Sequence, residues 1–209
     1  MAGLYEAILF DFDGVLVDSE PVHFVCWQEI LGEFGLSLDW ETYNRHGIGV
    51  SDRELLTMLC RQRNPPIEVE RLLAQYPRKK DLFRARMLEG NPFSEDVLKL
   101  LPELTDFRLA VVTSSGQGEV EPLLTAAGVR SFFQAAVYGG DVKRLKPAPD
   151  PYLLAVEKLG ARTALVVEDS NAGEASARAA GLDVLRIGHP SEMPRLLRER
   201  LGLGRDALD

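Results

Sequence analysis

Residues 7–14 of the chain read AILFDFDG, a short apolar run that ends in two acidic residues and a glycine. The run is continuously apolar rather than alternating, which is typical of a strand buried on both faces of a parallel sheet. Asp11 and Asp13 then stand at the carboxyl end of that strand, and Gly14 lets the chain turn away. Two carboxylates this close resist joint ionisation unless a cation neutralises them. The stretch therefore favours a divalent metal site, and an acidic turn exposed to solvent is the alternative.

Further apolar runs have the length of strands, and they span residues 109–113, 135–138, 164–167 and 184–187. Helical patterns lie between them at residues 119–127, 150–159 and 172–180, and several of these stop at a glycine. Strands that alternate with helices are typical of βαβ units. The pattern predicts an α/β fold whose core is a doubly wound, Rossmann-like parallel sheet.

Residues 15–88 interrupt this alternation, because they contain no convincing strand. Apolar side chains there follow the spacing of one helix face, at Phe24, Trp27, Leu31 and Phe34. This stripe is interpreted as the insertion's own core, and further helical stretches fit residues 52–61 and 68–86. We therefore expect a catalytic core of residues 1–14 and 89–209, interrupted by an all-helical cap. An insertion at this point lies over the carboxyl ends of the strands, where open α/β sheets bind ligands.

A second acidic pair follows the apolar run 164–167. Glu168 and Asp169 precede Ser170 and Asn171, at the start of the next helical pattern. Because the carboxyl ends of parallel strands share one edge of a sheet, the two acidic pairs can converge on one hard cation, and Mg²⁺ prefers carboxylate oxygens. The alternative is that Asp169, Ser170 or Asn171 only caps the helix.

Two stretches between the acidic pairs suit a phosphate group. Thr113 and Ser114 precede a helical pattern, so that a hydroxyl and backbone N–H groups can hold an anion there. Lys146 begins the stretch 146–149, KPAP, in which two prolines stiffen the backbone just before a helix. An ammonium held in this way can neutralise a phosphoryl group. Taken alone, Lys146 is as often a plain surface charge.

The order of these features resembles the haloacid dehalogenase-like hydrolase superfamily. An Asp pair, then Thr113, then Lys146, then the Glu168-Asp169 pair spans essentially the full chain. Three stretches and the helical cap resemble the beta-phosphoglucomutase and phosphoglycolate phosphatase branch, and the stretches are residues 10–20 (FDFDGVLVDSE), 146–149 (KPAP) and 167–173 (VEDSNAG).

The resemblance implies a role for each matched residue. Asp11 is the nucleophile that takes up a phosphoryl group as an aspartyl phosphate. Asp13 is the general acid that protonates the leaving oxygen and the base that later activates water. Thr113, Ser114 and Lys146 stabilise charge on the phosphoryl oxygens. The implied cofactor is Mg²⁺, held by Asp11, Asp13, Glu168 and Asp169, with Asn171 as a candidate partner of these ligands.

The resemblance also implies a phosphatase of a small phosphorylated metabolite, either a sugar phosphate or a phosphorylated carboxylic acid. Asp13 supports this, because dehalogenases of the same fold have no leaving oxygen to protonate and lack the second acid. A hexose phosphate mutase is the alternative, but Ile48 and Asp52 stand where the mutase has a lysine and an arginine. Arg53, one place later, is a candidate to compensate. A phospho-receiver domain is disfavoured by the second acid and by the cap.

In the cap, the candidates either for substrate contacts or for partners that support the site residues are Ser19, Glu20, His23 and Arg53. His23 matches a cap-hinge histidine of the mutase, although a lone histidine on a helix is slightly more often a packing residue. A phosphonate hydrolase needs a cap lysine as an imine-forming amine, and residues 15–78 contain none. Lys79 and Lys80 come late, beside Arg78, and are interpreted as a solvated face.

The amino-acid composition disfavours some classes of binding partner. The chain has 209 residues, with 32 Asp and Glu against 24 Lys and Arg, and a formal charge of −8. This balance disfavours nucleic acid, and the apolar runs are far shorter than the roughly 18 residues that indicate a membrane span. No secretory signal is visible, so we expect a cytoplasmic enzyme, a monomer or homodimer, acting on a small-molecule phosphorylated substrate. Cys26 and Cys60 lie on helical patterns outside any CxxC motif and are interpreted as packing residues.

Overall fold

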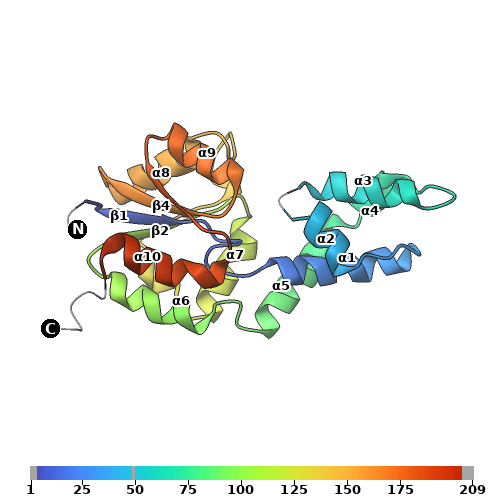
Figure 1. Ribbon diagram of the computed structural model, residues 1–209, viewed down its shortest axis with the longest axis horizontal. Coiled ribbons are helices and arrows are strands. Elements are labelled where there is room, and N and C mark those ends of the chain that lie inside the picture. The colour runs from blue at the N-terminus through green and yellow to red at the C-terminus, as the bar shows by residue number, and fades with distance from the viewer. Residues whose placement is uncertain (1–3, 49, 204–209) are drawn as a thin grey trace. The chain divides into compact units, whose positions relative to one another are not determined.

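The computed structural model of the chain describes residues 4–48 and 50–203. The backbone divides into two compact units (Figure 1), which are the core unit, Met1–Asp18 with Asn91–Asp209, and the helical unit, Ser19–Gly90. The core unit extends past Gly14 because the next residues fold back as a turn. In that turn Gly14 N donates to the Val17 carbonyl at 2.9 Å, and Leu16 N donates to the Phe12 carbonyl at 3.0 Å.

A parallel sheet forms the centre of the core unit. Its strands are β1 (Ala7–Phe10), β2 (Arg108–Val112), β3 (Ala135–Val137), β4 (Ala164–Glu168) and β5 (Asp183–Arg186). They lie in the order β3-β2-β1-β4-β5, and each pair is parallel. Every strand matches its predicted apolar run to within one residue at each end. The predicted doubly wound α/β fold is confirmed.

The chain reverses its direction across the sheet next to β1. The strands β1, β2 and β3 progress toward one edge, and β4 then returns to the other side of β1. The register pairs Phe10 with Val111 on one side and with Val167 on the other. The carboxyl ends of these central strands are therefore level with one another, at the kind of switch point where open α/β sheets bind ligands.

Helices cover both faces of the sheet, and they are α6 (Glu95–Leu100), α7 (Gln117–Ala126), α8 (Asp150–Leu159), α9 (Asn171–Ala179) and α10 (Met193–Leu201). In Figure 1, α8 and α9 lie on one face, and α6 and α10 lie on the other. The face beneath α8 forms an apolar core in which Leu9, Val112, Tyr152 and Val166 are completely buried. In residues 4–48 and 50–203, no helix is both long and apolar enough to cross a membrane.

The described part of the helical unit consists of helices and loops, with α1 (Glu20–Glu33), α2 (Trp40–His46), α3 (Asp52–Gln62), α4 (Val69–Leu73) and α5 (Tyr76–Glu89). Trp27 and Leu31 of the predicted stripe are fully buried, and Phe24 and Phe34 pack against the same cluster. The stripe is thus part of this unit's own core.

Two helices of this unit differ from the sequence pattern. The stretch 68–86 is broken into α4 and α5, because Pro77 has no N–H to continue a helix and instead occupies the first turn of α5. The short helix α2 was not predicted. Asp39 caps its N-terminus, because its side chain accepts a hydrogen bond from Thr42 N at 2.7 Å.

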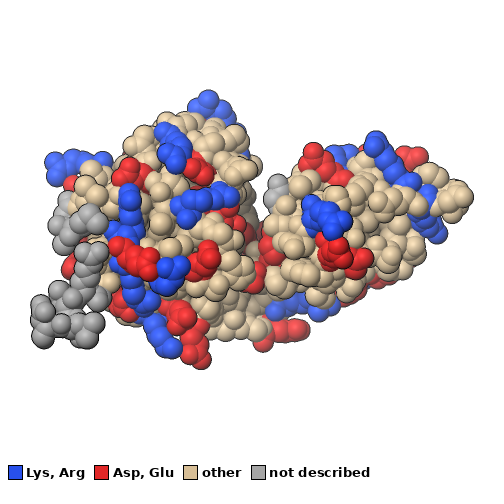
Figure 2. All heavy atoms as spheres, in the orientation of Figure 1, with Lys and Arg blue, Asp and Glu red and all other residues tan. Residues whose placement is uncertain are grey.

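Charged side chains of both signs are interspersed on the face of the core unit seen in Figure 2. Many of them form pairs, such as Arg198 with Glu103 at 2.8 Å and Arg108 with Glu6 at 2.6 Å. Charges of opposite sign on this face therefore lie close enough to form ion pairs.

Candidate active site

Acidic residues follow the two strands at the switch point. Asp11 comes directly after β1, and β4 ends at Glu168, with Asp169 next. Asp11 N donates to the Val167 carbonyl at 3.1 Å, which continues the ladder between the two strands up to the acids. Carboxylate oxygens of Asp11, Glu168 and Asp169 lie within 4.8 Å of one another. The structure therefore brings the two acidic motifs of the sequence together.

Lys146 is buried among these acids. Its ammonium lies 2.9 Å from Asp11 Oδ1 and donates to Glu168 Oε1 at 2.6 Å. A third hydrogen bond runs to the Val112 carbonyl at 2.9 Å, at the end of β2. Only 6% of the Lys146 side chain is exposed, so the lysine is a fixed charge of the site rather than a surface residue.

The site holds more negative than positive charge. Burial is the main reason that the pKa of Asp11 rises to about 8, and Glu168 adds to the rise while Lys146 opposes it. Burial, followed by the charge of Glu168, raises the pKa of Asp169 to about 6. Three carboxylates against one ammonium leave two negative charges when all are ionised, which one divalent cation balances. Clustered carboxylate oxygens also suit the ligand preference of Mg²⁺, so the residues present fit this ion.

Two glycines leave the space that the carboxylates occupy. A Cβ atom on Gly14 would come within 2.0 Å of Asp169 Oδ2, and a Cβ on Gly173 within 1.7 Å of Glu168 Oε1. Gly14 also has a φ of +75°, which residues with a side chain rarely adopt. The acids therefore reach their positions because both neighbouring residues lack a side chain.

Asp13 lies outside the cluster of three carboxylates, and a serine holds its side chain. Ser115 Oγ donates to Asp13 Oδ2 at 2.9 Å. Thr113 is buried, and its Oγ1 accepts from Ser115 N at 3.0 Å, whereas Ser114 is exposed. The contact of Ser115 was not predicted, because three consecutive hydroxyl residues leave open which side chain turns toward Asp13.

Ser170 resolves the capping question at α9. Its hydroxyl accepts from Gly173 N at 2.9 Å and donates to Glu168 Oε2 at 3.0 Å, so it both caps the helix and holds the acid. Asn171 is the first residue of α9 and is exposed.

Tyr152 is a further neighbour of the site that no motif in the sequence indicated. Its hydroxyl donates to Glu168 Oε1 at 2.7 Å, and its side chain is completely buried. Burial raises the pKa of Tyr152 well above its usual value, which keeps the hydroxyl protonated as a donor. The sequence indicates only that Tyr152 lies on the buried face of α8, and a tyrosine in that position is just as often a packing residue of the core.

The helical unit contains a polar cavity of about 260 Å³, lined by Glu20, His23, Tyr43, Gly47, Val50, Asp52 and Lys79. Tyr43 donates to Glu20 Oε2 at 2.6 Å, and Asp52 accepts from Trp27 Nε1 at 3.0 Å. Among the residues that the structure describes, the carboxylates of Glu20 and Asp52 and the ammonium of Lys79 therefore border this cavity.

Lys79 corrects an expectation from the sequence, because it is buried and not part of a solvated face. Only 6% of the residue is exposed, and its ammonium lies 2.6 Å from His23 Nδ1 and 3.8 Å from Asp52 Oδ2. The signal in the sequence that could have located it is its i, i+4, i+8 spacing with the apolar residues Phe83 and Met87, which places all three on one helix face.

The other two cap candidates lie apart from the lining of this cavity. Ser19 is buried just before α1, and its side chain makes no capping hydrogen bond. Arg53 is exposed and pairs with Glu70 at 3.2 Å, so the structure gives it no place in the cavity.

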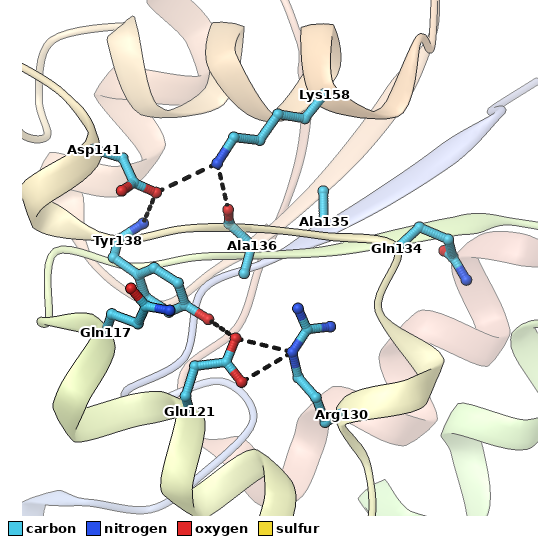
Figure 3. A pocket seen from close by; sticks show the side chains of 9 residues that line it. All are labelled: Gln117, Glu121, Arg130, Gln134, Ala135, Ala136, Tyr138, Asp141 and Lys158. Carbon is cyan, nitrogen blue, oxygen red and sulfur yellow. Dashed lines mark hydrogen bonds and ion pairs between the residues drawn. The ribbon is translucent and has the colours of Figure 1, made fainter.

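A second cavity of about 480 Å³ opens beside the edge strand β3 (Figure 3). Lys158 donates to the Ala136 carbonyl of this strand at 2.8 Å, and Arg130 Nε makes two hydrogen bonds to the Glu121 carboxylate. Tyr138 donates to the same carboxylate. Lys158 thus occupies a backbone carbonyl of an edge strand, and charged side chains on edge strands are a common protection against strand addition.

A doubly wound parallel sheet with buried acids and a fixed lysine at its switch point is typical of α/β enzymes, whose ligands bind at the carboxyl edge of the strands. Residues 8–187 match the haloacid dehalogenase-like hydrolase family, and the chain belongs to this family.

Several known proteins similar to the chain are phosphatases or bind phosphorylated sugars. The phosphorylated carbohydrates phosphatase of Thermotoga maritima is 31% identical, over 85% of this chain and 82% of that protein. The fructose-1-phosphate phosphatase of Escherichia coli is 30% identical, over 88% of this chain and 96% of that protein. The crystal structure of a CbbY mutant from Rhodobacter sphaeroides, in complex with xylulose-(1,5)bisphosphate, is 29% identical. That comparison has a TM-score of 0.68 and covers 87% of this chain and 85% of the other.

Proposed function

We propose that the protein is a Mg²⁺-dependent phosphatase of a small phosphorylated metabolite, a sugar phosphate or a phosphorylated carboxylic acid, with the helical unit as its cap. The observation that carries the proposal is the buried Lys146 ammonium, 2.9 Å from Asp11 at the switch point of the sheet. A carboxylate beside a fixed ammonium and further acids suits phosphoryl transfer, in which positioning and charge stabilisation dominate catalysis.

In this proposal Asp11 attacks the phosphorus atom, and the bond to the ester oxygen breaks. Asp13, oriented by Ser115, gives its proton to that leaving oxygen, and the phosphoryl group is held as an aspartyl phosphate on Asp11. Water then attacks this phosphorus while Asp13 takes up the water proton. Inorganic phosphate leaves, and both carboxyl groups return to their first state.

Lys146 and Thr113 stabilise the charge on the transferring oxygens. The residues that would hold Mg²⁺ are Asp11, Glu168 and Asp169, with the backbone carbonyl of Asp13 as the further ligand that the family resemblance implies. When bound, the ion neutralises negative charge on the carboxylates and on the phosphoryl group.

The phosphatase is favoured over a hexose phosphate mutase by the charges of the helical unit. A mutase also has to hold the second phosphate of a bisphosphate, which needs positive charge. Glu20 and Asp52 line the cavity of this unit, and the Lys79 ammonium, which also lines it, lies 3.8 Å from Asp52. Arg53, the candidate to compensate, pairs with Glu70 instead.

A screen of phosphorylated metabolites with Mg²⁺, followed by phosphate release, tests the proposal. We expect release from at least one sugar phosphate or phosphorylated acid by the wild-type protein and none by Asp11→Asn. Conversion of beta-glucose 1-phosphate to glucose 6-phosphate with a bisphosphate primer would instead establish the mutase. The absence of release from the whole panel would contradict the phosphatase.

A further inference from the structure

Tyr152 contacts both the acid and the lysine of the candidate site. Its hydroxyl donates to Glu168 Oε1 at 2.7 Å, and the Lys146 ammonium lies 5.0 Å from the centre of its ring. The side chain is completely buried between α8 and the sheet. A buried tyrosine needs a hydrogen-bond acceptor, but a neutral carbonyl would serve that purpose. Here the acceptor is a charged carboxylate of the site.

The two oxygens of Glu168 have different partners. Oε1 accepts two short hydrogen bonds, from Lys146 at 2.6 Å and from Tyr152 at 2.7 Å. Oε2 accepts longer ones, at 3.1 Å from the backbone N–H groups of Asp169 and Ser170 and at 3.0 Å from the Ser170 hydroxyl. The last torsion of a glutamate is soft, so this division of donors fixes the rotation of the carboxylate.

Tyr152 therefore supplies one of the two donors that keep Oε1 turned toward Lys146. Without the hydroxyl, Oε1 would keep Lys146 as its single donor while Oε2 kept its three, so the hold on Oε1 would weaken and its position would be less well defined. The ring is positioned to limit the movement of the Lys146 ammonium as well, because a cation over an aromatic face at this distance is attracted to it.

We propose that Tyr152 is a positioning residue that orients Glu168, with Lys146, for binding a divalent cation. The proposal rests on the metal site of the proposed function, and it adds to that site a residue, Tyr152, that lies outside the acidic motifs. Partners that orient metal ligands typically change metal affinity about 10- to 100-fold when they are removed.

Tyr152→Phe tests this assignment, because it removes one oxygen and keeps the ring that packs in the core. Tyr138→Phe is the matched control, since its hydroxyl also donates to a carboxylate, Glu121, but at the edge cavity of Figure 3. Mn²⁺ affinity is measured by calorimetry on the full chain without substrate. Thermal unfolding without metal checks that both variants are folded.

We expect Tyr152→Phe to weaken Mn²⁺ binding about ten-fold or more, and Tyr138→Phe to stay within about two-fold of the wild type. Equal affinities of the wild type and Tyr152→Phe would overturn the positioning role, as would an equal loss in both variants. Asp169→Asn separates the two hypotheses, because Mn²⁺ binding unchanged by it would refute the metal site itself. Phosphate release is scored independently of these affinities, so a failed phosphatase assignment is distinguishable from a failed role of Tyr152.

Discussion

The Ser115 hydroxyl donates to Asp13 Oδ2 at 2.9 Å, joining two residues that are 102 positions apart in the chain. The contact connects the loop after β2 to the loop after β1, at the carboxyl edge of the sheet. A general acid has to point at its proton acceptor, so a hydrogen bond that fixes its carboxyl group bears directly on the proposed proton transfer.

Ser115→Ala is therefore expected to lower kcat about ten-fold, a part of the roughly 10²- to 10⁴-fold that acid and base catalysis supplies. Metal affinity should not change, because Ser115 holds only the side chain of Asp13, which lies outside the cluster of three carboxylates, whereas the proposed ligand of Asp13 is its backbone carbonyl. Steady-state phosphate release and Mn²⁺ calorimetry measure the two quantities. Ser191→Ala, at an exposed serine of the core unit, is the control. An unchanged kcat in Ser115→Ala would remove the orienting role.

Asp13→Asn and Asp169→Asn should separate proton transfer from metal binding. The amide that Asp13→Asn introduces cannot exchange a proton, so phosphate release should fall about 100-fold or more while Mn²⁺ still binds. Asp169→Asn removes a charged oxygen from the cluster and should lose both binding and activity. Full activity of Asp13→Asn in a folded protein would exclude Asp13 as the acid and base.

Much of the fold follows from local signals in the sequence. The apolar runs end in acids at Asp11 and Glu168, and a parallel sheet with alternating helices places such ends on one edge. Chain order then determines which motifs meet there. This is why the acidic pairs and Lys146 could be located together before their geometry was known.

The site contacts that the sequence did not predict depend on tertiary structure, and the sequence signals for them are weak. The contact of Ser115 with Asp13 depends on the direction of a loop, and that of Tyr152 with Glu168 depends on the rotation of α8 about its axis. No sequence motif encodes either of these. Lys79 was misjudged because its charge suggested solvent, whereas its position on the buried face of α5 decides its burial. The break before α5 was not predictable from local sequence either, because Pro77 is compatible both with the first turn of a helix and with the end of one.

Gly14→Ala is expected to destabilise the core unit. Residue 14 has a φ of +75°, a conformation that costs a residue with a side chain about 1–2 kcal/mol. The new Cβ would also come within 2.0 Å of Asp169 Oδ2. Urea unfolding measures the loss in the free energy of unfolding, and weaker Mn²⁺ binding should accompany it. Gly118→Ala is the control, because nothing lies within 4 Å of a Cβ at this position in α7. Because Gly118 lies in the first turn of α7 and alanine is favoured over glycine in a helix, this control should lose no stability.

Cys26 and Cys60 should be unreactive in the folded protein. Cys26 is fully buried and Cys60 is 2% exposed, and burial raises the pKa of both thiols. Because the thiolate is the reactive form, a disulfide reagent such as DTNB should modify neither residue under native conditions and both after unfolding. Rapid labelling of the native chain would contradict their assignment as packing residues.

Mg²⁺ should stabilise the protein against unfolding. Asp11, Glu168 and Asp169 are close together only in the folded chain, so the ion binds the native state in preference to the unfolded one. At a concentration 100 times the dissociation constant, one such site adds about 2.7 kcal/mol to the free energy of unfolding. Thermal unfolding is measured with MgCl₂ and, for comparison, with NaCl of equal ionic strength. MgCl₂ should raise the unfolding midpoint Tm of the wild type and leave that of Asp169→Asn unchanged. The same shift in both proteins would mean that the ion acts away from these carboxylates.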